Sequence, residues 1–214
     1  GTLTQGEYLV DIMNQVGYDI FTPGNHEFDY QIPRLLELAD RLDAQVISSN
    51  FINLSTGESV FKPYTILDYG DVQVAYVGIT TPDSFTKSTP TYFQDDAGNY
   101  LYSFCEGEDG QALYDNVQAS VDAARAEGAD YVVAVAHLGV VEGGEPWRSV
   151  DVIANTTGID VMIDGHSHTV MDGQEVANRD GETVLLCQTG TKLETMGKVV
   201  RPSTFQAVET SFSI

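Results

Sequence analysis

The chain has four histidines, His26, His137, His166 and His168, and each of them lies in a turn that follows a predicted strand. Imidazole is the commonest transition-metal ligand in proteins and the commonest acid or base near neutral pH. In an open α/β sheet, ligands bind beyond the carboxyl ends of the strands. Four histidines that all stand at strand exits therefore predict one convergent site.

His166 and His168 lie in the run Asp-Gly-His-Ser-His-Thr at residues 164–169. A spacing of two at the end of a strand predicts that both side chains point to the same side. Gly165 allows a close approach of the backbone or an unusual φ. We interpret the pair, together with His137, as metal ligands, although a single histidine at a strand end is more often structural.

Asn25 and His26 follow a Pro-Gly turn, and Asp29 comes three residues after the histidine. An amide oxygen is an acceptable ligand for a divalent metal. Asp29 is expected to hold His26 in one tautomer, to cap the following helix, or to do both. Glu27 is interpreted as a structural carboxylate near the site rather than as a ligand.

Three short segments carry a resemblance to a known family: residues 24–27 (Gly-Asn-His-Glu), 136–137 (Ala-His) and 165–168 (Gly-His-Ser-His). In this order they resemble the last three of the five motifs of the calcineurin-like metallophosphoesterases. Residues 27–29 (Glu-Phe-Asp) and 188–190 (Gln-Thr-Gly) resemble the branch that contains 5'-nucleotidases, 2',3'-cyclic-nucleotide phosphodiesterases and UDP-sugar hydrolases. The resemblance extends over essentially the whole chain.

The resemblance implies a centre of two divalent metal ions. Asn25, His137 and His166 would ligate one ion, and His168 would ligate the other. The donor types suit Zn, Mn, Fe or Co and do not decide among them.

The resemblance also implies the reaction, which is the hydrolysis of phosphate esters, most specifically of nucleotides, by a hydroxide that bridges the two metals. His26 would not bind metal but would lie against the phosphate and assist the leaving group, with Asp29 as its partner. Asn25 and His26 would contact the substrate.

The sequence departs from the family pattern ahead of Asn25. The family has an Asp-x-His motif and then a Gly-Asp motif there, whereas this chain has only Asp11 and Asp19, and neither follows a glycine. We therefore expect a chain that is truncated at its N-terminus, with an incomplete metal site and impaired catalysis. A C-terminal nucleoside-binding domain is expected in the full-length protein.

The pattern of apolar residues alternates between helices and buried strands, which indicates an α/β class. The resemblance refines this to a layered sandwich of two mixed sheets flanked by helices, lacking its first strand or strands. Residues 1–214 are predicted to form one catalytic domain, with a surface insertion at 81–110 that either packs or serves function. Thr4 is predicted to cap a first helix that ends at Gly17. Residues 205–214 are predicted to form a final strand.

The charge balance narrows the partners. Ten Lys and Arg against 32 Asp and Glu give a net charge of -22, which disfavours polymeric nucleic acid but not a small phosphate ester bound through a cation. No apolar run reaches the roughly 20 residues of a transmembrane helix. The state of Cys105 and Cys187 stays open, and without a CxxC pattern they do not form a zinc site. An extracellular, periplasmic or cell-surface location follows from the resemblance only.

The spacing excludes two other classes of metal hydrolase. The metallo-β-lactamase type requires His-x-His-x-Asp-His, but Thr169, Val170 and Met171 follow His168. A metalloprotease requires His-Glu-x-x-His, and no histidine stands at the required position after His26. A non-catalytic binding or surface module with a degenerate phosphoesterase fold remains the alternative. Trp147 is expected either to line the mouth of the site or to pack against the domain.

Overall fold

The computed structural model describes residues 3–200 and 209–213, and it is built around a six-stranded mixed sheet with the order β10-β11-β9-β8-β6-β5. The four inner strands run parallel to one another, while the two edge strands β5 and β10 are antiparallel to their neighbours. The strands span the following residues: β5 Tyr64–Asp68, β6 Gln73–Thr80, β8 Tyr131–His137, β9 Val161–Asp164, β10 Val170–Ala177 and β11 Thr183–Thr189.

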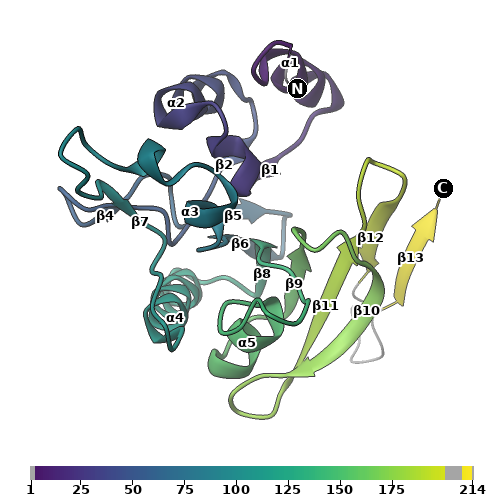
Figure 1. Cartoon of the computed structure of the whole chain (residues 1–214). Coiled ribbons are helices and arrows are strands. Elements are labelled where there is room, and N and C mark those ends of the chain that lie inside the picture. Colours follow the sequence, from purple (N-terminus) through teal and green to yellow (C-terminus); the bar gives the residue numbers. More distant parts are fainter. Residues whose placement is uncertain (1–2, 201–208, 214) are drawn as a thin grey trace.

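Two helices, α4 (Gln111–Ala126) and α5 (Ser149–Asn155), cover one face of this sheet (Figure 1). Side chains alternate between the faces of a strand, so every second residue of β6 and β8 packs under these helices. The buried cluster contains Ala75, Val77, Ile79, Val132, Ala134 and Ala136 from those strands, and Leu113, Val117, Val121, Val152 and Ile153 from the helices. This packed layer fixes the strand ends relative to one another.

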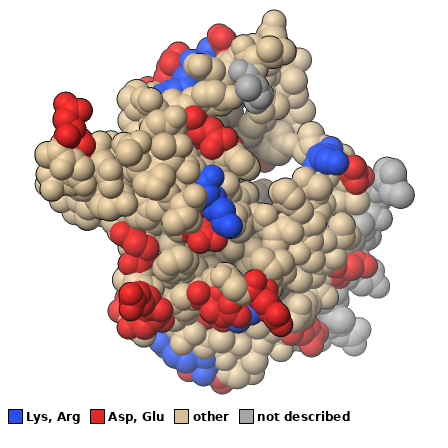
Figure 2. Space-filling model, in the orientation of Figure 1, with Lys and Arg blue, Asp and Glu red and all other residues tan. Residues whose placement is uncertain are grey.

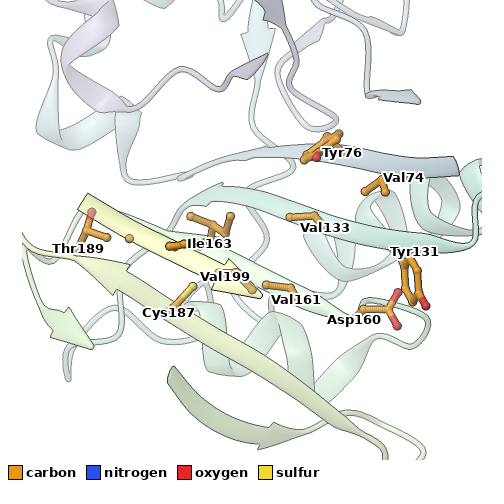
Figure 3. A pocket seen from close by; sticks show the side chains of 12 residues that line it. Val74, Tyr76, Tyr131, Val133, Asp160, Val161, Ile163, Cys187, Thr189 and Val199 are labelled. Carbon is orange, nitrogen blue, oxygen red and sulfur yellow. The ribbon is translucent and has the colours of Figure 1, made fainter. Parts of the chain in front are cut away.

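The opposite face of the sheet carries the remaining alternate residues, among them Val74, Tyr76 and Val133 (Figure 3). Strand β12 (Met196–Val200) runs over this face and pairs with β13 (Glu209–Ser213). Between β12 and the sheet lies a mostly apolar pocket of about 480 Å³. None of the four histidines lines it, so this cavity is separate from the histidine site.

The N-terminal part of the structure brings two helices next to a short parallel strand pair. These elements are α1 Glu7–Val16, β1 Ile20–Phe21, η1 Asn25–Phe28, α2 Gln31–Arg41 and β2 Gln45–Val46. The expected cap was wrong: α1 begins after Gly6, whose φ of 92° suits glycine, and Thr4 only accepts a long hydrogen bond from the N–H of Tyr8. The predicted end at Gly17 is confirmed.

A second core combines Ile32 and Leu35 of α2 with aromatic side chains, of which Phe28, Phe51, Phe93 and Phe104 are fully buried. The segment 81–110 contributes two of these rings and contains three short elements, α3 Ser84–Lys87, η2 Pro90–Phe93 and β7 Tyr102–Ser103. Strand β7 pairs with β3 (Ile52–Asn53), which also pairs with β4 (Glu58–Ser59). The segment therefore packs into the molecule; that it is an insertion stays a prediction.

Several expectations can be compared with this architecture. The α/β class with sheets flanked by helices is confirmed, and among the sheets of the described residues the six-stranded one is mixed. Of the expected last strand, residues 209–213 form β13, and residues 205–208 and 214 lie outside the described residues. Cys105 and Cys187 are both free thiols. In the described part of the chain, no helix combines the length and the hydrophobicity that crossing a bilayer requires.

Candidate metal and phosphate site

The parallel strands β6, β8, β9 and β11 bring polar residues to one edge of the sheet, because their carboxyl ends all point that way. His137 is the last residue of β8, and the turn with His166 and His168 follows β9. Asp83 follows β6, and Gln188 is the last but one residue of β11. Three of the four histidines thus stand at strand exits of one sheet, whereas His26 follows β1, which belongs to a separate two-stranded sheet.

Asn25 joins two of the histidines. Its side chain is buried, and its Oδ1 atom lies 3.0 Å from Nε2 of His137 and 3.0 Å from Nδ1 of His166. The two imidazole rings have centroids 5.0 Å apart at an angle of 58°. Three potential donor atoms from three distant parts of the sequence therefore converge on one point.

The ring of His137 is enclosed by glycines. A Cβ atom at Gly24 would lie 2.6 Å from its Cε1 and Nε2 atoms, and one at Gly165 would lie 3.2 Å from its Nδ1 atom. Burial lowers the pKa of His137 to about 4, and the neighbouring His166 adds to the effect. The imidazole is therefore neutral at physiological pH, which is the form that ligates metals.

His166 contacts a carboxylate as well as the amide of Asn25. Its Nε2 atom lies 3.7 Å from Oδ2 of Asp83. The interaction with His166 holds the pKa of Asp83 below its usual range. Gly139 leaves room for the ring, because a Cβ atom there would be 3.2 Å from Cδ2 of His166. A carboxylate on the second nitrogen of a histidine is a common way to orient a metal ligand.

The backbone of the His166–His168 turn differs from the extended geometry that we expected. Strand β9 ends at Asp164, and His166 and His168 have φ values of 76° and 56°, in the left-handed region. The argument from strand alternation is therefore wrong at this turn, although His166 does reach Asn25. Of the two roles considered for Gly165, close approach is the one observed, because it lies against His137.

His168 is the predicted ligand that stands apart. Its side chain is exposed, and in the described structure it makes neither of the contacts to Asn25 that His137 and His166 make. It lies near enough that its charge lowers the pKa of His137 slightly. Within residues 3–200, no group of three or more His, Cys, Asp and Glu gathers closely enough to hold a metal ion; the observed cluster has two histidines and an amide.

His26 and Asp29 form a pair on the rim of the cluster. Nδ1 of His26 lies 2.9 Å from Oδ2 of Asp29, and the histidine side chain is 73% exposed. Helix α2 begins after Tyr30 without a side-chain cap, so Asp29 contacts His26 and does not cap that helix. Glu27 accepts a hydrogen bond from the N–H of Gly24 at 2.7 Å, which closes the turn that carries Asn25.

Sequence reasoning missed Asp83, Asp164 and Ser149. Asp164 is buried at the end of β9, where it accepts hydrogen bonds from the backbone N–H groups of Leu138 and Gly139 and from the Ser149 hydroxyl. Both aspartates stand at strand ends, so the rule that singled out the histidines would have found them. Trp147 packs against the main core and donates a hydrogen bond to the carbonyl of Gly107.

Comparison with known proteins identifies the class. The family model described as "Bacterial capsule synthesis protein PGA_cap" matches residues 3–185. A Bacillus subtilis protein named trifunctional nucleotide phosphoesterase protein YfkN is 28% identical over 188 residues, which cover 81% of this chain and 12% of that protein. A 5'-nucleotidase of Vibrio parahaemolyticus is 25% identical over 186 residues, or 82% of this chain and 31% of the relative.

Among solved structures, a 5'-nucleotidase precursor from Thermus thermophilus superposes with a TM-score of 0.76 at 22% identity, covering 97% of this chain and 41% of that one. The fold is thus that of a calcineurin-like phosphoesterase of the 5'-nucleotidase type. The chain belongs to the PGA_cap family. It spans less than a third of the length of the two named relatives.

Proposed function

We propose that the protein hydrolyses phosphate esters with the help of divalent metal ions, and that nucleotides are the substrate class. The observation that carries the proposal is the convergence of His137 Nε2 and His166 Nδ1 on Asn25 Oδ1, each at 3.0 Å, at the carboxyl edge of the sheet. The names of the relatives support it, since they are nucleotide phosphoesterases and nucleotidases.

The donor set fits a divalent metal. Two neutral imidazoles and an amide oxygen suit Zn, Mn, Fe or Co, and burial keeps His137 in the neutral form. We propose that Asn25, His137 and His166 hold one ion and that His168 contributes to a second. A bound ion would supply positive charge for phosphoryl oxygens and Lewis-acid activation of water. Ahead of Asn25, this sequence contains neither the Asp-x-His motif nor the Gly-Asp motif of the resembling family.

We propose that His26 holds the proton that goes to the leaving oxygen. Its Nδ1 atom lies against the carboxylate of Asp29, so the proton for the leaving oxygen would be carried on Nε2 of the doubly protonated ring, which is free to face the substrate. The ring is 73% exposed and follows Asn25 directly in the sequence, and we propose that both residues contact one phosphate ester. Asp29 acts as the partner that orients the ring.

The surface charge agrees with a small substrate rather than a polymer. The net charge is -22, and Figure 2 shows acidic side chains in several separate clusters on one face, with some basic side chains between them. Polymeric nucleic acid is disfavoured by such a field, whereas a bound cation reverses it locally. A nucleoside-binding domain and a location outside the cytoplasm stay predictions from the resemblance.

A non-catalytic binding or surface module is the second candidate. It is favoured by the limited ligand set of residues 3–200, which contain no cluster of three His, Cys, Asp or Glu. The description of the family, which names capsule synthesis, also differs from the hydrolase names of the relatives. We favour hydrolysis because His137 is neutral and enclosed by glycines. These two features suit a metal ligand, and a histidine with a purely structural role would not need them.

The test is release of phosphate from AMP and from an aryl phosphate, measured after removal of metals and again after addition of Mn²⁺, Co²⁺ or Zn²⁺. The proposal predicts slow hydrolysis that requires metal and is lost in His166→Ala. The matched control is Gln118→Met, a substitution in α4 away from the cluster, which should retain the wild-type rate. Hydrolysis that is absent with every metal, or equal in wild type and His166→Ala, would contradict the proposal.

A further inference from the structure

The turn that carries His166 and His168 adopts a backbone that its residues do not favour. Both histidines have left-handed φ values, 76° and 56°, which are uncommon for residues with a Cβ atom. Such conformations persist only where surrounding contacts fix them. The contacts that hold this turn therefore decide where the histidine rings point.

Gln188 supplies three of these contacts. Its side chain is buried, with 1% exposed, and it comes from the neighbouring strand β11. The Oε1 atom accepts hydrogen bonds from the N–H of Thr169 at 2.7 Å and from the hydroxyl of Ser167 at 3.0 Å. The Nε2 group donates to the carbonyl of Gly165 at 2.9 Å. One amide thus binds the beginning, middle and end of the turn.

The same amide connects this turn to the one that follows His137. Nε2 of Gln188 also donates to Oδ2 of Asp164 at 3.1 Å. Asp164 in turn accepts the backbone N–H groups of Leu138 at 2.9 Å and Gly139 at 3.0 Å, directly after His137. The two histidine turns are therefore tied to one buried pair of side chains, and every hydrogen-bonding position of the Gln188 amide is used.

We propose that Gln188 is a positioning residue for the candidate metal site, and that Asp164 extends its effect to the His137 turn. This inference rests on the proposed function for its consequence, which is metal binding. Its structural part, that Gln188 holds the His166–His168 turn, stands without it. Removal of a residue that orients a metal ligand typically weakens metal binding or activity by about 10- to 100-fold.

The experiment replaces Gln188 by Met, which keeps the length of the side chain but removes the amide. Gln118→Met is the matched control: Gln118 lies in α4, donates to Asp122 and Thr157, and accepts from the N–H of Thr157, so it loses a similar set of hydrogen bonds elsewhere. Two properties are measured in each protein. They are the affinity and visible spectrum of bound Co²⁺, and hydrogen exchange of the Thr169 amide in the metal-free protein.

We expect Gln188→Met to bind Co²⁺ about 10- to 100-fold more weakly with an altered spectrum, and to exchange the Thr169 amide faster. Gln118→Met should match wild type in both. Ser167→Ala removes one of the four hydrogen bonds of Gln188, together with those that the Ser167 hydroxyl makes with the Val140 N–H and the Thr169 hydroxyl. It should give a smaller change in the same direction and serves if Gln188→Met does not fold.

The outcomes separate the two claims. If wild type binds no Co²⁺, the proposed function fails, and the exchange of Thr169 alone decides whether Gln188 holds the turn. Wild-type exchange and wild-type Co²⁺ affinity in both Gln188→Met and Ser167→Ala would overturn the inference. Equal losses in Gln188→Met and Gln118→Met would also overturn it, because the effect would then be general destabilisation.

Discussion

Acidification of the metal-free protein should cost stability through one histidine, His137. Its pKa in the folded protein is lowered from the ordinary 6.5 to about 4, first because the ring is buried and then because other histidines are near. Below pH 6.5 the unfolded chain therefore takes up a proton at this ring that the folded protein does not bind. This difference in proton binding favours unfolding. The contribution of His137 to the free energy of unfolding is therefore full above pH 6.5 and is lost as the pH falls toward 4.

The size of the effect follows from the two pKa values. A difference of about 2.5 between 6.5 and about 4, at about 1.4 kcal/mol per pH unit, gives about 3 kcal/mol between pH 7 and pH 4. This is a large part of the 5–15 kcal/mol or so by which a domain is typically stable. Other groups also contribute to the pH dependence of stability, including the buried Asp164, whose pKa is raised by burial. Only a difference between variants isolates the histidine.

The assay is urea unfolding of wild type and His137→Asn, with a chelator present, at pH 7, 6, 5 and 4. The free energy of unfolding of wild type relative to the variant should fall by about 3 kcal/mol over this range. Val132→Ala, a fully buried site in the same strand, is the control and should parallel wild type at every pH. Curves for wild type and His137→Asn that stay parallel would refute the reasoning.

Three further predictions concern close contacts and a buried thiol. Gly24→Ala places a Cβ atom 2.6 Å from the ring of His137, so Co²⁺ affinity measured by titration should fall at least about tenfold while circular dichroism stays native; unchanged affinity would contradict this. Gly78→Ala places a Cβ atom 2.3 Å from the carbonyl oxygen of Ile47, and this backbone atom cannot move aside as a side chain can. Thermal unfolding should show that the free energy of unfolding falls by about 1–3 kcal/mol or more. An unchanged melting temperature would refute that contact. Burial raises the pKa of Cys187 to about 11, so only about one in a thousand of its thiols is ionised at pH 8, and mass spectrometry should find it unreacted with iodoacetamide until urea is added. Rapid alkylation of the native protein would show that the thiol is accessible.

The fold could be predicted where side-chain period and strand order agree. Strand β8 alternates between the helix-covered face and the other face, and its valines and alanines predict a buried strand. The face of α1 was harder to place. Its stripe of Leu9, Ile12, Met13 and Val16 predicts an amphipathic helix, yet Ile12 and Val16 are 54% and 66% exposed and Val10 is the buried residue. Period shows that a helix has an apolar face, but tertiary contacts decide what covers it.

The site could be predicted in its members but not in its connections. Histidines at strand exits are visible in the sequence, whereas the contact of Asn25 with His166 spans 141 positions and depends on how β1 is placed beside the main sheet. The left-handed backbone of His166 and His168 has no sequence signal, since glycine is the residue that usually marks it. Gln188 was noted as part of a motif, but its four hydrogen bonds require the register between β9 and β11.

The central claim is that Asn25, His137 and His166 form a metal site, and X-ray absorption at the zinc edge tests it most directly. Protein loaded with one equivalent of Zn²⁺ should show two imidazole nitrogens at about 2.0–2.1 Å, together with oxygen ligands. His166→Ala should show one imidazole, and Gln118→Met should show two. Zinc that is bound without imidazole in wild type, or with the same number of imidazoles in wild type and His166→Ala, would contradict the account.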